Sequence, residues 1–460
     1  MARSSSLVAT LTLIAACAAP GLTTRQAVPS STTRWSAVSL DTEVRRLTTD
    51  RRSTDALWPG FDPRRIPLAV YDGERTYLFR HPTPPTEFTM LVGADSGTGV
   101  MPGRHATITA NSSVELGGVQ TATVILPAKS ESGTLSELAA LAIHEAFHVY
   151  QRARHPGWIA NEADLFTYPT DSVALLVRRR LETAALRRAL DAPDAVGAQC
   201  QAREALALRR QRYAGMDSAF AAYERGTELN EGLATYVEQR SLGRVTKELP
   251  AADFPPASIR QRAYATGPAL ARLLDRLAPD WRVMFETNDR VTLDEALASA
   301  IGAGDTCTTG AAALEAATAK ARTDIAAHKS DHERMRTSFE QRAGWRLTVE
   351  TSGGEPLWPQ GFDPLNVERV GPVQVLHGRF VALGNSLGKL EVLDASALTT
   401  GAGPHPLFQG VNRVLLTGLA KPELVEADGA VRLTAPGVTL DFRKARVVRE
   451  GESIRVCVGC

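Results

Sequence analysis

The pattern of apolar residues changes twice along the chain, and these changes constrain the fold more than any other feature. From Ile66 to about Pro127, short apolar runs alternate with turn residues, as β-strands do. From Thr134 to about Arg342, Ala, Leu, Arg and Glu recur at helical spacing with few glycines or prolines inside each segment. After Trp345 the short Val, Leu and Thr runs return, separated by Gly, Pro, Asn and Asp.

These changes predict an α+β protein with three structured parts. The expected parts are an N-terminal β-rich lobe over residues 36–130, a mainly helical body over residues 131–344, and a small C-terminal β-domain over residues 345–460. Within the first part, Ile66–Tyr71 and Thr76–Arg80 flank Asp72–Gly73, which predicts a β-hairpin with a tight turn. Thr121–Leu126 predicts a further strand.

One short sequence occurs twice. Leu57–Pro63 reads LWPGFDP, and Leu357–Pro364 reads LWPQGFDP. Two copies do not make a repeat protein, and the segments diverge afterwards. We interpret both as a Trp-anchored turn used for packing.

The first residues are typical of an export signal. Arg3 is followed by an apolar run from Leu7 that is too short to cross a bilayer, and then by small residues. Ile14–Cys17 resembles a bacterial lipobox, in which the cysteine receives the lipid, so we expect a signal peptide over residues 1–17 and lipidation of Cys17. A plain signal peptide with a chance cysteine is the alternative. Residues 18–35 are polar enough to act as a flexible tether.

Export affects the interpretation of the other four cysteines: Cys200, Cys307, Cys457 and Cys460. An oxidising compartment favours disulfides, although the sequence does not determine the pairing. Cys457 and Cys460 form a CxxC that can be a redox or metal dithiol. No second CxxC is present to complete a tetrahedral site, so a local structural disulfide is favoured.

The charge balance gives no reason to expect a nucleic acid or an acidic membrane surface as partner. The chain has 52 Lys and Arg against 51 Asp and Glu, a net charge of +1. Arg178–Arg180 is a short basic run within a helical pattern, which we interpret as a solvated helix face rather than a phosphate-binding stripe.

The pentapeptide His144–His148 reads HEAFH and carries the chemistry. Residues four apart lie on one face of a helix, so both imidazoles can reach one cation. Glu145 lies beside them, where it can accept a proton from a water at the metal, as zinc hydrolases require. Thr134–Glu137 matches a capping box, which supports a helix here. A chance match on a surface helix, or a core histidine, is the alternative.

A zinc site needs a third protein ligand, and no further histidine follows at metzincin spacing. The segment Glu228–Glu238, on a second helical pattern, is the best source. Its residues NEGLATYVE resemble the third-ligand helix of gluzincin metallopeptidases, especially those of the aminopeptidase N type. The resemblance implies a zincin-like fold and makes Glu231 the zinc ligand, with Glu228 and Glu224 as fallbacks. Without it, Glu231 is an ordinary glutamate on an amphipathic helix.

Tyr264–Gly267 resembles the Tyr-x-x-Gly helix start of the same enzymes. The resemblance gives the Tyr264 hydroxyl the role of stabilising the oxyanion of the tetrahedral intermediate. An ordinary core aromatic is the alternative reading of Tyr264 alone.

The sequence departs from this family in two respects. The interval between His148 and Glu231 is much longer than in the aminopeptidases, and the patterns at Asp171–Leu190 and Val196–Tyr213 predict a helical insertion there. The Gly-x-Met-Glu-Asn loop that binds a free substrate amine is absent, so an endopeptidase or another amide hydrolase fits as well as an aminopeptidase.

We therefore expect an exported zinc metallopeptidase with one Zn²⁺ per chain, acting on a peptide or protein and anchored to the bacterial cell envelope through its N-terminal lipid only. His144, His148 and Glu231 would bind zinc, Glu145 would act as the general base, and Tyr264 would support the oxyanion. Two alternatives stay open: a non-catalytic zincin-fold envelope lipoprotein, and a zinc amide hydrolase with a non-peptide substrate. Oligomeric state stays undetermined.

Overall fold

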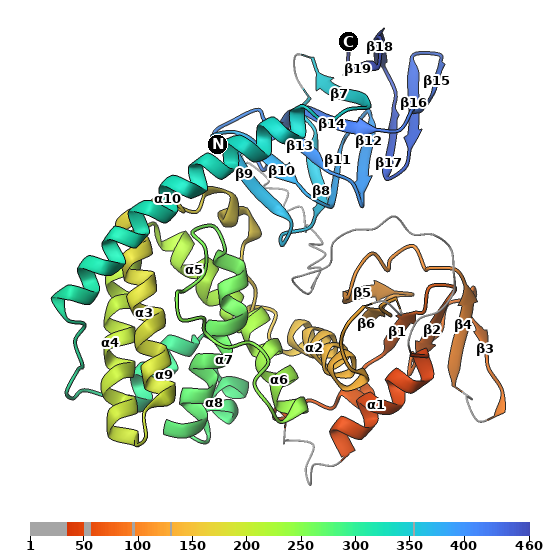
Figure 1. The fold of residues 1–460 in the computed structure, drawn as a ribbon. Helices are drawn as coiled ribbons and strands as arrows, with labels where there is room; N and C mark the ends of the chain where they lie inside the picture. The colour runs from red at the N-terminus through yellow and green to blue at the C-terminus, as the bar shows by residue number, and fades with distance from the viewer. Residues whose placement is uncertain (1–34, 50–56, 94–96, 129–130, 353–354) are drawn as a thin grey trace, which may run out of the picture. The chain divides into compact units, whose positions relative to one another are not determined.

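The computed structural model describes residues 35–49, 57–93, 97–128, 131–352 and 355–460. The chain divides into two compact units at Ala326/Ala327, inside helix α10 (Ala311–Glu340). The mixture of helices and sheets confirms the predicted α+β class (Figure 1). The predicted signal peptide with Cys17, and the tether apart from residue 35, lie outside the described residues.

A six-stranded sheet opens the N-terminal unit (described residues 35–326). Its strands are β1 (Leu68–Tyr71), β2 (Arg75–Phe79), β3 (Thr89–Met90), β4 (Thr98–Pro102), β5 (Ser112–Leu116) and β6 (Val119–Ile125), in the order β3-β4-β2-β1-β6-β5. β1 and β2 pair antiparallel, with Tyr71 opposite Thr76, which confirms the predicted hairpin. Gly73 in its turn has φ +97°, a conformation that glycine adopts readily. β6 confirms the predicted strand and pairs parallel with β1.

Helices make up the rest of this unit. They are α1 (Ala37–Thr49), η2 (Pro63–Arg65), α2 (Leu135–Arg154), η4 (Glu162–Thr167), α3 (Val173–Asp191), α4 (Ala195–Tyr213), α5 (Ser218–Thr227), η5 (Glu228–Gly232), α6 (Leu233–Leu242), α7 (Ile259–Leu277), α8 (Trp281–Thr287) and α9 (Leu293–Ile301). Helix α1 was not predicted from sequence, although its buried residues Leu40, Val44 and Leu47 recur at helical spacing. No helix among the described residues is long and apolar enough to span a membrane.

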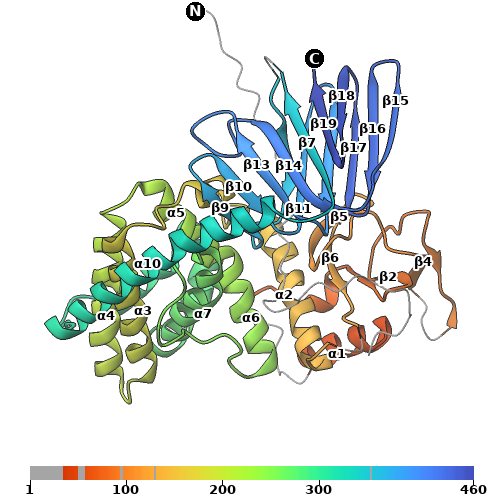
Figure 2. The same cartoon turned by 45° about the horizontal axis from the view of Figure 1, so that its top comes forward.

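Helix α2 lies beside the sheet and next to β6 (Figure 2). Ile143 and Phe147 of α2 share one apolar core with Val70 of β1 and Val124 of β6. Because such a core removes most of the apolar face of α2 from water, it fixes the rotation of the helix and hence the direction of its remaining side chains.

Trp58 anchors the first copy of the repeated sequence. Its ring is buried and lies edge-on to Phe147 at 5.5 Å, to Trp158 at 5.9 Å and to Trp281 at 5.4 Å between ring centroids. The second copy behaves differently, because Trp358 lies in strand β8 (Trp358–Phe362) and its ring is 48% exposed. The prediction of a Trp-anchored turn is therefore confirmed for the first copy and wrong for the second.

Helices α3 and α4 pack together and confirm the predicted helical pair between α2 and η5. The prediction of a solvated face at Arg178–Arg180 is wrong for Arg179, whose side chain is buried. Its Nε donates to Asp253 Oδ2 at 2.9 Å, and its Nη1 donates to the Pro256 carbonyl at 3.0 Å. Composition alone cannot separate a solvated arginine from one with a buried acidic partner elsewhere in the chain.

The C-terminal unit, residues 327–460, contains the end of α10 and two sheets. One sheet has the order β18-β19-β7-β14-β13-β10-β9, so β9 forms an edge, and the other has the order β15-β16-β17-β12-β11-β8. The strands are β7 (Trp345–Thr351), β8 (Trp358–Phe362), β9 (Val367–Gly371), β10 (Gln374–His377), β11 (Phe380–Asn385), β12 (Gly388–Leu393), β13 (Ala397–Gly401), β14 (Val411–Leu419), β15 (Glu423–Ala427), β16 (Ala430–Ala435), β17 (Val438–Phe442), β18 (Ala445–Glu450) and β19 (Ser453–Val458).

Two disulfides pair the four cysteines of the described chain. Cys200 of α4 pairs with Cys307, which follows α9, and Cys457 pairs with Cys460 in the C-terminal tail. The second pair is the local bridge that the sequence favoured.

Candidate metal centre

Helix α2 holds His144, Glu145 and His148. The helix begins at a complete capping box, in which the Thr134 hydroxyl accepts from the Glu137 backbone and the Glu137 carboxylate accepts from the Thr134 backbone, as predicted. All three functional side chains are buried. The two imidazole rings stand edge to face with centroids 4.8 Å apart, as expected of neighbours one turn apart on one helix face.

Glu231 comes from a second, continuous helical segment made of α5, η5 and α6. Its Oε2 atom lies 3.3 Å from Nε2 of His148 and 3.6 Å from Nε2 of His144, and the two Nε2 atoms lie 3.1 Å apart. The structure therefore brings together the three residues that the sequence analysis named as ligands. The element that carries Glu231, η5, is a π-helical turn, which often marks a functional position within an α-helix.

The hydrogen bonds on the far side of each ring set its tautomer. Nδ1 of His144 lies 3.1 Å from Oε2 of Glu238, and a carboxylate only accepts, so Nδ1 carries the proton. Nδ1 of His148 lies 2.8 Å from Oε1 of Gln151, whose amide nitrogen already donates to the carbonyls of Leu229 and Asn230. Gln151 Oε1 is therefore the acceptor, and both Nε2 atoms present lone pairs toward Glu231.

Three electron-pair donors thus meet at one buried point. Ligands about 2.0–2.1 Å from a tetrahedral ion stand about 3.3 Å from one another, close to the observed 3.1–3.6 Å. The separations and the mixed imidazole and carboxylate donors suit a divalent transition metal. His144, His148 and Glu231 can therefore hold a metal ion.

Arg260 supports Glu231 from the opposite side. Its Nη2 donates to Glu231 Oε1 at 2.7 Å, and its Nη1 pairs with Glu162. Burial alone raises the pKa of Glu231, but the contacts with the two imidazoles and the charge of Arg260 outweigh it and hold that pKa well below its usual range. One carboxylate oxygen is therefore bound to arginine while the other faces the histidines with its negative charge intact.

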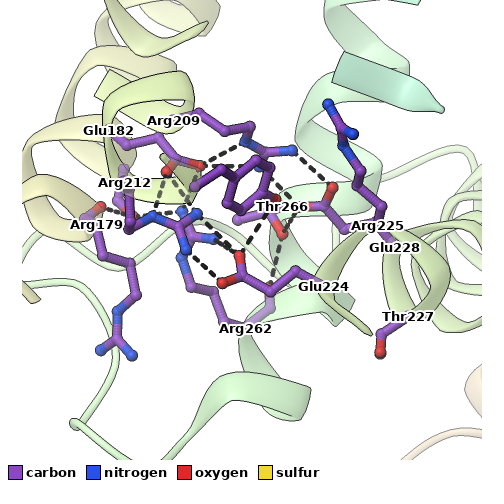
Figure 3. Close-up of polar contacts among 12 residues, drawn as sticks. Arg179, Glu182, Arg209, Arg212, Glu224, Arg225, Thr227, Glu228, Arg262 and Thr266 are labelled. Carbon is purple, nitrogen blue, oxygen red and sulfur yellow. Dashed lines mark hydrogen bonds and ion pairs between the residues drawn. The ribbon is translucent and has the colours of Figure 1, made fainter. Parts of the chain in front are cut away.

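The fallback ligands Glu228 and Glu224 belong to a different site (Figure 3). Glu228 accepts two parallel hydrogen bonds from Arg209, both at 2.8 Å, and a third at 2.6 Å from Thr266. Glu224 pairs with Arg212. These contacts engage both glutamates elsewhere and leave Glu231 as the candidate third ligand.

We call the six residues Glu182, Arg209, Arg212, Glu224, Glu228 and Arg262 the buried ionic cluster. It joins α3, α4, α5, η5 and α7, and its three carboxylates balance three guanidinium groups (Figure 3). Burial raises the pKa of Glu182, but the charges of Arg209, Arg212 and Arg262 outweigh it and lower that pKa below its usual value. The cluster fixes the helices that carry Glu231 and Tyr264.

Tyr264, on α7, is buried close to the candidate metal ligands. Its ring is nearly parallel to that of His144, with centroids 6.3 Å apart. The ammonium of Lys247 lies 4.7 Å from the centre of the tyrosine ring. The structure therefore places the ring of Tyr264 beside His144, and the role of its hydroxyl stays a prediction.

Four neighbours of the site were missed from sequence: Glu238, Gln151, Arg260 and Lys247. Glu238 lies two helical turns after Glu231, and Gln151 lies one turn after His148, so helical spacing alone would place both on the ligand faces. Arg260 lies one turn before Tyr264 on α7. Lys247 lies in the loop between α6 and α7, and no local pattern identifies it.

A comparison of the chain with protein-family models, curated proteins and solved structures finds no match. The function must therefore be argued from the residues of the site and their geometry.

Proposed function

We propose that this protein is a zinc metallopeptidase of the gluzincin type, with His144, His148 and Glu231 as the residues that hold one Zn²⁺. The observation that carries the proposal is the meeting of two imidazole lone pairs and one carboxylate oxygen within 3.1–3.6 Å of one another. When bound, zinc polarises a carbonyl and lowers the pKa of a water molecule towards 7.

The chain's own residues supply the remaining chemistry. Glu145 accepts a proton from the attacking water and returns it to the leaving nitrogen. Tyr264 donates a hydrogen bond to the oxyanion of the tetrahedral intermediate. Glu238 and Gln151 hold the two imidazoles in the tautomer that ligation requires.

Two features favour catalysis over a purely structural metal. A structural zinc ion has four protein ligands, whereas this group has three, which leaves one coordination position for water or substrate. Glu145 is also fully buried next to a ligand. Because burying a carboxylate is costly, its presence favours a chemical role over chance.

We further propose that the protein is exported and anchored to the bacterial cell envelope through Cys17. The leader and the lipobox-like segment support this proposal. The two disulfides also support it, because such bridges persist in oxidising compartments and are rare in the cytosol.

The decisive experiment compares the wild-type protein with Glu145→Gln. We expect wild type to contain one tightly held zinc ion at this site and to cleave members of a peptide library. Because Glu145 is the proton acceptor and not a ligand, the variant should keep this zinc ion and cleave about 10²- to 10⁴-fold more slowly. Glu315→Gln, on an exposed position of α10, is the matched control and should retain full activity.

Each negative outcome has a distinct meaning. Absence of zinc from the buried site, or equal cleavage by Glu145→Gln, would overturn the catalytic proposal and favour the non-catalytic lipoprotein. Bound zinc without cleavage of any peptide would instead favour an amide hydrolase with a non-peptide substrate.

A further inference from the structure

The C-terminal unit contains a second group of potential metal ligands, formed by His328, His332 and Glu368. The two histidines are four residues apart on α10, and their ring centroids lie 3.8 Å apart. Oε1 of Glu368, on β9, lies 2.6 Å from Nε2 of His332 and 4.0 Å from Nε2 of His328. Three donor atoms from one helix and one strand therefore meet at one place.

The group lies on a surface of α10 that already packs on the sheet. His328, His332 and Phe339 recur at helical spacing, so they share one stripe of the helix. Phe339 is buried against Val370 of β9, and the Thr417 hydroxyl donates to its carbonyl at 2.6 Å. Val370 follows Glu368 by two residues and so lies on the same face of the strand. The histidine pair extends this helix–strand contact by two turns towards the start of α10.

We propose that His328, His332 and Glu368 form a second site for a divalent transition-metal ion, Zn²⁺ being the expected occupant. The proposal does not depend on the proposed zinc site at His144. Tetrahedral ligands stand about 3.3 Å apart, and the observed separations of 2.6 and 4.0 Å lie on either side of that value. The side chains are 13%, 16% and 31% exposed, so an ion can reach them from solvent.

The residues between the two histidines distinguish this site from the first, because none of them can act as a general base. His144 is followed by a buried glutamate, whereas His328 is followed by Lys329, which cannot act as a carboxylate base. The acidic residue within this segment, Asp331, is half exposed and pairs with Arg334. The ion would therefore cross-link α10 to the edge strand β9 without an adjacent general base.

Two imidazoles also determine the class of ion. Imidazole nitrogen suits zinc and its neighbours in the first transition row, whereas Mg²⁺ and Ca²⁺ prefer oxygen ligands. The site should bind Zn²⁺ and ignore Mg²⁺ at equal concentration.

The test counts Zn²⁺ ions bound per chain after chelation and titration with Zn²⁺ alone. We expect two equivalents in wild type and one in Glu368→Gln and in His332→Gln. Glu333→Gln, at an exposed position beside His332, is the matched control and should keep both equivalents. His144→Ala should also bind one, but at the other site.

Hydrogen exchange identifies the site that is lost. Zn²⁺ should slow amide exchange at residues 328–340 and 367–371 in wild type and in His144→Ala, but not in Glu368→Gln. Equal stoichiometry in wild type and Glu368→Gln, or unchanged exchange in these two segments, would overturn the second site. The second site would also be overturned if wild type bound a single Zn²⁺ that Glu368→Gln kept and His144→Ala lost. That outcome would leave the proposed peptidase intact.

Discussion

The backbones of Gly232 and Gly267 touch where the helix of Glu231 crosses the helix of Tyr264. A methyl group on Gly267 would lie 2.5 Å from Cα of Gly232, and one on Gly232 would lie 2.8 Å from Cα of Gly267. These are the glycines of the two motifs, Asn-Glu-Gly and Tyr-x-x-Gly. Because neither glycine has a side chain, the helices cross closely enough to bring a candidate metal ligand and the expected oxyanion donor to one site.

Gly267→Ala should therefore separate the two helices and weaken the site. Overpacking of this kind costs about 1–3 kcal/mol, so we expect a loss of that size in the free energy of unfolding, measured in urea, together with weaker Zn²⁺ binding. Gly157→Ala is the control, because its added methyl meets open space. A Gly267→Ala protein as stable as Gly157→Ala would show that the crossing tolerates a side chain.

Glu238→Ala should weaken metal binding although Glu238 is not itself expected to be a ligand. The hydrogen bond from Nδ1 of His144 to this carboxylate fixes the orientation of the ring. Loss of such a partner lowers the affinity for the metal about 10- to 100-fold. Glu238→Gln keeps an acceptor oxygen and should fall between wild type and Glu238→Ala. Competition with a chromogenic chelator measures all three, with Glu248→Ala, at an exposed position, as control. Equal Zn²⁺ affinities of wild type and all three variants would show that Glu238 does not orient His144 for metal binding.

Tyr264→Phe should retain zinc and lose activity. Removal of one oxyanion donor costs about 10²–10³ in kcat, while KM should change little because the ring remains. Steady-state kinetics on the best library peptide measures both constants. Tyr71→Phe is the control for loss of a hydroxyl, because the Tyr71 hydroxyl donates to the Gly73 carbonyl in its own turn. Full activity in Tyr264→Phe would assign the tyrosine to packing against His144.

The buried ionic cluster should make stability depend on acid. The pKa of Glu182 is lower in the folded chain than its ordinary value of 4.5, so its stabilising contribution is complete above about pH 4.5 and is lost as pH falls through the folded value. In Glu182→Gln, three buried arginines face only two carboxylates. The free energy of unfolding should therefore fall by about 3–5 kcal/mol at neutral pH.

The measurement is Tm by calorimetry from pH 7 to pH 3 with a chelator present, so that metal loss does not contribute. The fall in Tm below pH 4.5 should be shallower in Glu182→Gln than in wild type, and Glu315→Gln should follow wild type. Parallel curves for all three proteins would assign acid sensitivity to other carboxylates.

Local rules predicted the parts of this protein that depend on neighbours in sequence. The hairpin turn at Asp72–Gly73 and the capping box of Thr134 each involve residues within a few positions, and both are confirmed. The pair His144 and His148 is predictable for the same reason, because one helix turn places them together. The α+β class followed from the periodicity of whole segments.

Long-range pairing could not be predicted in this way. Arg179 is a surface residue by composition and becomes a buried one because Asp253 comes from a distant loop. Trp58 and Trp358 occupy nearly identical local sequences but differ in exposure, because aromatic partners from α2 and α8 surround only the first. Glu231 was selected over Glu228 by resemblance alone, and the geometric reason for that choice is visible only in three dimensions.

That reason is the π-helical turn at Glu228–Gly232. In an unbroken α-helix, Glu228 and Glu231 would share a face and face the same neighbours. The wider turn shifts the phase of the helix, so Glu228 pairs with Arg209 whereas Glu231 also faces the histidines of α2. A single residue inserted or deleted here would rotate everything downstream relative to α2. The number of residues in this turn therefore decides which glutamate can act as the third ligand, as much as the side chains do.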